Sequence, residues 1–400
     1  MRKIFIVLLQ LLPLFALGQE DIIKKFELNQ KYKKPDQTKY YFKDIIDLEH
    51  TPVKNQTGAG TCWSYATNSF IESEMMRMGK RPYELSRIYS LRCAYLEKAE
   101  NYIRMHGGMA WSTGGECHDV LNMYSLYGTM PQMVYPGYDM PINTAKLAEM
   151  NDALKNFADR MIDEPKSEIA REWRQAFNAI MTSYIGDAPD KFNFDGHNYT
   201  PQSFAKKSVG IHPEDYIELA SYTNKPYYKK LMLMVPDNWS FNRVYNIKME
   251  DITDVIDRAL SRGYTVAWEA DISEPYFSWE NGIAYVPEKD IHDMSEKEKD
   301  ELFDGPKMER FIAAETRQKA LNNFETTDDH AMHIVGMAED QNHKKYYKVK
   351  NSWDTNNEYS GYIYVTKTYI KYKTTTILLH KSALSTEIRN KLNLGTSREY

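Results

Sequence analysis

The chain of 400 residues is poor in cysteine, in clustered positive charge and in metal-binding motifs. Three cysteines are too few for a scaffold held together by disulfides. The formal net charge is −5 and no run of Lys and Arg residues occurs, so we expect neither a nucleic acid nor an anionic membrane as a partner. No CxxC or HExxH spacing occurs either. We therefore expect no metal and no cofactor.

The longest apolar stretch lies at the N-terminus. Residues 1–18 combine a charged start, an apolar segment and a small-x-small cleavage site at Ala16-Leu17-Gly18, as secretory signals do. The apolar segment is interrupted by Gln10 and Pro13 and is too short to span a membrane. We expect an exported protein, periplasmic or extracellular, that begins at Gln19 after cleavage.

Cys62 stands at the start of a helical pattern. Apolar residues recur at helical spacing from Trp63 to Met78, and Gly79 can end the helix. The N–H groups and the dipole at a helix N-terminus favour an anion, which would lower the pKa of the thiol and yield a nucleophilic thiolate. Gln56 offers an amide donor for an oxyanion. A buried structural cysteine is the alternative, because free cysteines are often buried.

Whether the other two cysteines, Cys93 and Cys117, form a disulfide is a separate question. In an oxidising compartment an odd count leaves one thiol unpaired or paired between chains. A disulfide between Cys93 and Cys117, with Cys62 free, is one arrangement that this count allows.

Two histidines compete for the role of the base that a cysteine nucleophile requires. His330 and His333 lie on one predicted strand, an odd number of residues apart, so they face opposite sides and only one can meet Cys62. The next strand leads to Asn351 and Trp353. If the two strands form a hairpin, the Asn351 amide can orient the imidazole and the Trp353 ring can shield that bond from water. Each residue alone has an ordinary structural explanation, but their joint occurrence indicates catalysis.

Periodicity divides the chain into a helix-rich half and a strand-rich last third, an α+β pattern. Helices are expected over 62–79, 85–105, a stretch around 121–126, two segments within 143–185, and 252–260. Residues 290–323 are expected to be mostly helical, whereas 186–251 show no clear period. Strands are expected over 264–270, 282–286, 330–337, 346–350, 361–366 and 374–379.

The segments that carry this chemistry resemble those of the papain-like cysteine peptidases. The matching motifs are NQ (55–56), TCWS (61–64), STGG (112–115), DHAM (329–332), VKNSW (349–353) and GYI (361–363). The resemblance implies that Cys62 is the nucleophile and that His330, rather than His333, is the base. It further implies that Asn351 orients His330 and that Gln56 stabilises the oxyanion.

The Gly114-Gly115 pair has two explanations. Glycines before a helix are consistent with a simple turn. They can also expose backbone N–H and C=O groups to which an extended peptide pairs. The resemblance favours the second explanation and assigns Gly114 and Gly115 to substrate binding.

The spacing narrows the resemblance to a subgroup. His330 follows Cys62 at far more than the ~130–150 residues usual in papain and cathepsins. The additional residues resemble the insertion of the bleomycin hydrolase/aminopeptidase C group, with YIGDAPDKF (184–192), TPQSF (200–204) and AWEADI (267–272). The resemblance implies a homo-oligomer, a hexamer in that group. It also implies a C-terminal arm that restricts cleavage to free N-termini; here residues 391–400 are polar and end in Tyr400.

We therefore expect a papain-like fold with a helical lobe, a β-rich lobe and a large helical insertion. The expected divisions are a signal peptide (1–18) and a catalytic domain (19–400), comprising a helical lobe (about 44–140), the insertion (141–250), a β-rich lobe (251–392) and a tail (393–400). The expected activity is hydrolysis of peptides, preferentially from a free N-terminus. Endopeptidase activity, peptide binding without turnover, and acyl transfer to an amine remain alternatives.

Overall fold

The computed structural model describes residues 39–137, 143–163 and 171–394. The expected signal peptide and most of the expected tail lie outside these residues. In the part that is described, no helix is both long and apolar enough to cross a membrane.

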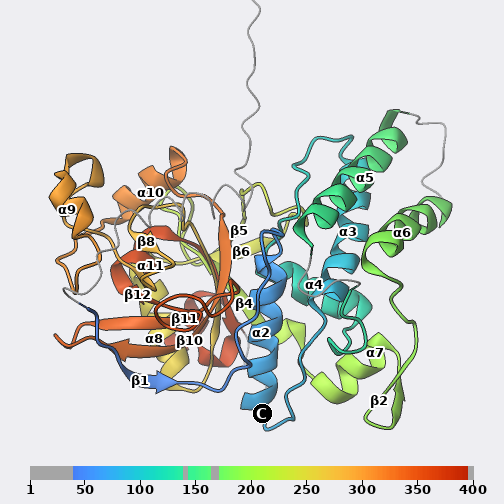
Figure 1. The fold of residues 1–400 in the computed structure, drawn as a ribbon, viewed down its shortest axis with the longest axis horizontal. Coiled ribbons are helices and arrows are strands. Elements are labelled where there is room, and N and C mark those ends of the chain that lie inside the picture. The colour runs from blue at the N-terminus through green and yellow to red at the C-terminus, as the bar shows by residue number, and fades with distance from the viewer. Residues whose placement is uncertain (1–38, 138–142, 164–170, 395–400) are drawn as a thin grey trace, which may run out of the picture.

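Helices gather on one side of the molecule and a large sheet on the other (Figure 1). The helical side contains α2 (Cys62–Arg77), α3 (Arg87–Arg104), α4 (Cys117–Tyr127), α5 (Thr144–Asp163) and α6 (Arg171–Ile185). These five helices confirm those expected before residue 186. Ser86 caps the N-terminus of α3, since its side chain accepts a hydrogen bond from the Tyr89 N–H.

The sheet is mixed and follows the order β5-β6-β4-β13-β7-β10-β11-β12-β9-β8, with β1 paired to β10. Its strands are β1 (Lys43–Asp47), β4 (Tyr216–Ala220), β5 (Lys230–Met232), β6 (Arg243–Asn246), β7 (Val266–Ala270), β8 (Phe277–Ser278), β9 (Ile283–Ala284), β10 (His330–Glu339), β11 (Lys345–Lys350), β12 (Tyr362–Thr366) and β13 (Thr374–His380). The strands expected from the sequence are all present. β10 and β11 pair antiparallel, which confirms the expected hairpin.

Smaller elements complete the fold. They are the hairpin β2 (Phe192–Phe194) with β3 (His197–Tyr199), and the helices α7 (Pro201–Phe204), α8 (Met249–Ser261), α9 (Glu296–Asp300), α10 (Ala314–Asn322), α11 (Lys367–Lys373) and α12 (Thr386–Lys391). The expectation that residues 290–323 are mostly helical is wrong, because only the short α9, α10 and a 3-10 turn are helical there. Gly305 and Pro306 interrupt this charged segment.

The expected helical insertion, 141–250, is helical mainly up to Ile185. Beyond it the chain enters the main sheet through β4, β5 and β6. All five residues of β4 are buried. A strand covered on both faces shows no alternation of apolar and polar residues, so no strand period could be detected there.

Helix α2 lies between the other helices and the sheet, inside the first of two hydrophobic cores. One core joins the helices and the other joins the sheet with α8 and α11. α2 contacts α3 and α4 on one side and β7 and β10 on the other, and it runs through the centre of Figure 1. Every residue from Cys62 to Met75 is buried. The expected one-sided apolar pattern therefore understates its burial, because α2 is a central helix rather than a surface one.

Candidate active site

Cys62 is the first residue of α2 and its side chain is buried. Burial raises the pKa of the thiol to about 12, and hydrogen bonds with the backbone of Ala331 and Trp63 act in the opposite direction. The charges of Asp237 and Glu269 add to the increase. The expectation that the helix terminus lowers this pKa is thus wrong for Cys62 taken alone, because desolvation outweighs the local N–H groups.

His330 opens β10, and Asn351 follows β11 directly. Nε2 of His330 lies 2.7 Å from Oδ1 of Asn351, and both side chains are buried. The Trp353 ring lies beside the imidazole, with 4.7 Å between the ring centroids and 34° between the planes. The indole covers the imidazole, as expected. Burial lowers the pKa of His330 to about 4.

His333 has a different environment. Its Nδ1 lies 3.0 Å from Oγ of Ser69, two turns further along α2 than Cys62. Burial and the Lys350 ammonium lower the pKa of His333 well below its usual value. These contacts fit a histidine that packs β10 against α2, and they separate His333 from His330, the member of the pair that contacts Asn351.

Hydrogen bonds to the segment that follows Asn351 hold Gln56 in place. The Oγ of Ser352 donates to Oε1 of Gln56 at 2.5 Å, and the Gln56 N–H donates to the Ser352 carbonyl at 2.8 Å. A further bridge pairs Asn55 with Trp353. The loop before α2 is therefore held against the chain after β11, which brings the expected oxyanion donor to the same place as Asn351.

The glycine pair is less open than expected. The Gly114 N–H donates to Oγ of Ser112 at 3.0 Å, and Nζ of Lys98 donates to the Gly114 carbonyl at 2.5 Å. A Cβ atom at Gly114 would lie only 1.9 Å from Oδ2 of Asp237, whose Oδ1 accepts from Ser112 at 2.6 Å. At Gly115 a Cβ would meet Trp63 and Trp239 at 3.1 Å. Both backbone groups of Gly114 are thus already bonded within the protein.

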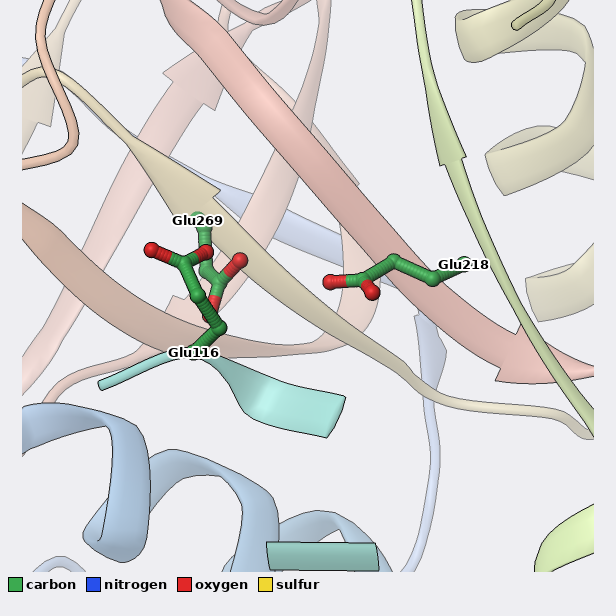
Figure 2. Close-up of side chains that lie close together, drawn as sticks. All are labelled: Glu116, Glu218 and Glu269. Carbon is green, nitrogen blue, oxygen red and sulfur yellow. The ribbon is translucent and has the colours of Figure 1, made fainter. Parts of the chain in front are cut away.

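Four carboxylates in this region were not anticipated, the partly buried Asp237 and three buried glutamates. Asp237 lies in the β5–β6 loop, and Glu116, Glu218 and Glu269 converge nearby (Figure 2). The sequence held one usable signal, since Glu269 is the only charged residue of the apolar strand β7. Asp237 carried none, because its position depends on a loop that comes from a distant part of the chain.

All three cysteines are free and buried. The disulfide considered between Cys93 and Cys117 is therefore not formed. Tyr89 contacts Cys93, and Glu269 contacts Cys117.

This fold and this set of side chains are those of a papain-like cysteine peptidase, and the comparisons with known proteins agree. The chain belongs to the Peptidase C1-like family, whose sequence model matches residues 16–397. It is similar to aminopeptidase C of Lactobacillus delbrueckii subsp. lactis, at 24% identity with 88% of this chain and 84% of the relative covered. It is also similar to aminopeptidase C of Streptococcus thermophilus, at 22% identity with 93% and 88% covered.

A solved structure supports the same fold. PepW from Lactobacillus rhamnosis aligns with a TM-score of 0.66 at 20% identity, covering 92% of this chain and 86% of that one. The resemblance to the bleomycin hydrolase/aminopeptidase C group is thereby confirmed, and the protein is a cysteine peptidase.

Proposed function

We propose that the protein is an exported aminopeptidase that hydrolyses peptides with Cys62, His330, Asn351 and Gln56. The His330–Asn351 hydrogen bond carries this proposal, because it is the arrangement that fixes a base in one orientation. The Cys62 sulfur attacks the scissile carbonyl and its proton passes to His330. His330 then protonates the leaving amine, and water hydrolyses the thioester to release the acid and restore the thiol.

The pKa shifts explain why the two groups act together. Burial opposes a charge on Cys62 and on His330 when each is considered alone. Transfer of the proton from sulfur to imidazole creates both charges at once, so each one stabilises the other in a poorly solvated cleft. Asn351 supports this state because its Oδ1 accepts a hydrogen bond from Nε2 of the imidazolium. Nδ1 is then the nitrogen that exchanges the proton with the thiol.

The oxyanion has two proposed donors. The backbone N–H of Cys62 is the first, and the Gln56 side-chain amide is the second. Ser352 binds the amide oxygen of Gln56 and so sets the direction of the amide group. This arrangement is formed before substrate binds, which is the condition for efficient electrostatic stabilisation.

Selectivity for a free N-terminus is supported by Asp237. Its carboxylate covers Gly114, whose N–H and C=O are both engaged within the protein. A peptide that extended far beyond the residue being removed would have to displace this carboxylate. A short substrate would instead present its α-ammonium to it. The names of the curated relatives agree with this specificity. Endopeptidase activity is the second candidate.

The cellular location and the oligomeric state are also part of the proposal. Residues 1–18 direct export, and a homo-oligomer is expected from the family resemblance. Detection of the mature protein beginning at Gln19 in the periplasmic or culture fraction tests the first point. The mass of the purified protein in solution tests the second.

Two experiments test the activity. A thiol-directed epoxide should add once to the wild type and not to Cys62→Ala, as measured by intact mass; a peptide-binding protein without catalysis would resist the reagent. Products from a mixed peptide pool should then show stepwise loss of N-terminal residues. Internal cuts would instead identify an endopeptidase.

A further inference from the structure

Three glutamates from separate parts of the chain meet in the interior. Glu116 precedes α4, Glu218 lies on β4 and Glu269 lies on β7. They are only 2%, 6% and 4% exposed. One carboxylate oxygen from each lies within 4.8 Å of the other two, and Figure 2 shows the three side chains converging.

The hydrogen-bond donors around this cluster are too few for its oxygens. Oγ of Thr376 is placed to donate to both Glu218 and Glu269, but a hydroxyl has one proton and can donate to only one of them at a time. Oε2 of Glu116 has no hydrogen-bond partner among the described residues, although it is fully buried. A buried carboxylate oxygen without a partner is costly. Of the three carboxylates, only that of Glu218 has an ionic partner among the described residues, the imidazole of His118.

The neighbours of the cluster hold its members in place. Nδ1 of His118 lies 2.7 Å from Oε2 of Glu218, and the Cys117 N–H donates to Oε1 of Glu269. Such contacts resemble the outer partners that orient carboxylate ligands around a metal. One carboxylate oxygen of Glu116 remains within 4.8 Å of an oxygen of each of the other two glutamates.

We propose that Glu116, Glu218 and Glu269 bind a divalent, oxygen-preferring metal ion of the calcium class. Carboxylates are the ligands such ions prefer, with Ca–O distances of about 2.3–2.6 Å. Two oxygens on opposite sides of a calcium ion are then about 5 Å apart, which accommodates the separation found here. An organic cation such as a guanidinium is larger and requires displacement of the buried surroundings.

The position of the cluster gives the ion a structural role. Glu116 belongs to the helical side, whereas Glu218 and Glu269 belong to the sheet. Glu269 lies opposite Ala331 in the β7–β10 register, and the backbone of Ala331 contacts Cys62. The ion would join the two sides of the molecule close to the nucleophile. Sequence motifs could not show this site, because its three ligands are far apart in the chain.

Metal binding to the full-length protein tests the proposal. After treatment with EDTA and removal of the chelator, thermal unfolding is followed with and without millimolar CaCl2, MnCl2 or MgCl2. Calcium should raise the Tm of the wild type by about 2–4 °C or more. Glu116→Gln keeps the shape of the side chain but should lose this response. Glu387→Gln is the matched control, since Glu387 is an exposed glutamate paired with Lys391 on α12, and it should keep the response.

A second measurement covers the case in which Glu116→Gln fails to fold. Isothermal titration of the wild type with CaCl2 should give close to one ion per chain. No binding of any of the three ions, or an unchanged response in Glu116→Gln, overturns the proposal. Stabilisation by argininamide but by no metal would assign the cluster to an organic cation and would also overturn it. Peptidase activity is not a readout, so this outcome is independent of the proposed function.

Discussion

Nε2 of His330 and Oδ1 of Asn351 are 2.7 Å apart at the open end of the β10–β11 hairpin. The strand pairing places the two residues, and the Trp353 ring lies beside the His330 imidazole. The proposed base is thus held by the β10–β11 hairpin, while the proposed nucleophile stands at the start of a central helix. Catalysis should therefore depend on the packing of β10 against α2.

The two histidines of β10 should differ sharply in their importance. Cys62→Ala and His330→Ala should each reduce turnover to background, since they remove the nucleophile and the base. His333→Ala should keep substantial activity, because His333 contacts Ser69 rather than Asn351. Hydrolysis of an aminoacyl amide with a fluorescent leaving group measures this, and circular dichroism checks the fold. Equal inactivity of His330→Ala and His333→Ala would show that the base is misassigned.

Much of this arrangement could be predicted from the sequence because it depends on local patterns. The start of α2 at Cys62 and the β10–β11 hairpin follow from periodicity and short range turns. The features that could not be predicted depend on contacts between distant segments. β4 is buried on both faces and has no alternation, and Asp237 reaches Gly114 from a loop more than a hundred residues away. Burial at Cys62 outweighs the helix terminus, and burial is a property of the assembled fold.

Loss of the proposed oxyanion donor should slow the chemical step. Gln56→Ala should lower kcat by about 10²–10³, the usual cost of one such donor. Ser352→Ala should have a smaller effect in the same direction, because Ser352 only orients the Gln56 amide. Steady-state kinetics on one unblocked peptide compare the two variants with the wild type. An unchanged kcat in Gln56→Ala would mean that other groups hold the oxyanion.

The preference for free N-termini should weaken when the charge on Asp237 is removed. Asp237→Asn keeps the size of the side chain but removes the carboxylate that would meet the α-ammonium. The rate ratio of unblocked to N-acetylated peptide should therefore fall by about tenfold, the equivalent of ~1.4 kcal/mol. Asp195→Asn is the control, since Asp195 pairs with Arg81 at the surface.

The C-terminal tail provides the competing explanation for the same preference. In the resembled group an arm in the cleft excludes longer chains, and the corresponding candidate here is within 391–400, of which 395–400 lie outside the described residues. If this segment acts as an arm, removal of 393–400 should raise cleavage of blocked peptides relative to unblocked ones. If neither the truncation nor Asp237→Asn changes the rate ratio of unblocked to blocked peptide, the endopeptidase alternative is favoured.

Acid should destabilise the fold in part through buried histidines, and His380 allows this to be measured away from the proposed active site. Burial lowers the pKa of His380 to about 4, and the Arg77 and Lys381 charges act in the same direction. An unfolded histidine has a pKa near ~6.5. Between these two values the unfolded chain binds a proton that the folded chain does not. The free energy of unfolding should therefore fall as the pH drops from about 6.5 to about 4, with His380 contributing up to about 1 kcal/mol per pH unit.

The variant His380→Asn isolates this contribution. The Nδ1 of His380 accepts a hydrogen bond from the Ser382 N–H, and an asparagine oxygen can replace that acceptor. Loss of the imidazole also removes its stacking with Tyr264, so the variant should be less stable at pH 7. Its free energy of unfolding should nevertheless vary less steeply between pH 6.5 and 4, as measured by urea unfolding at several pH values. His343→Asn should keep the wild-type slope, since the His343 side chain is 83% exposed and is solvated in both states. If the free energy of unfolding falls equally steeply with pH in the wild type and in His380→Asn, His380 takes up its proton as readily in the folded protein as in the unfolded chain.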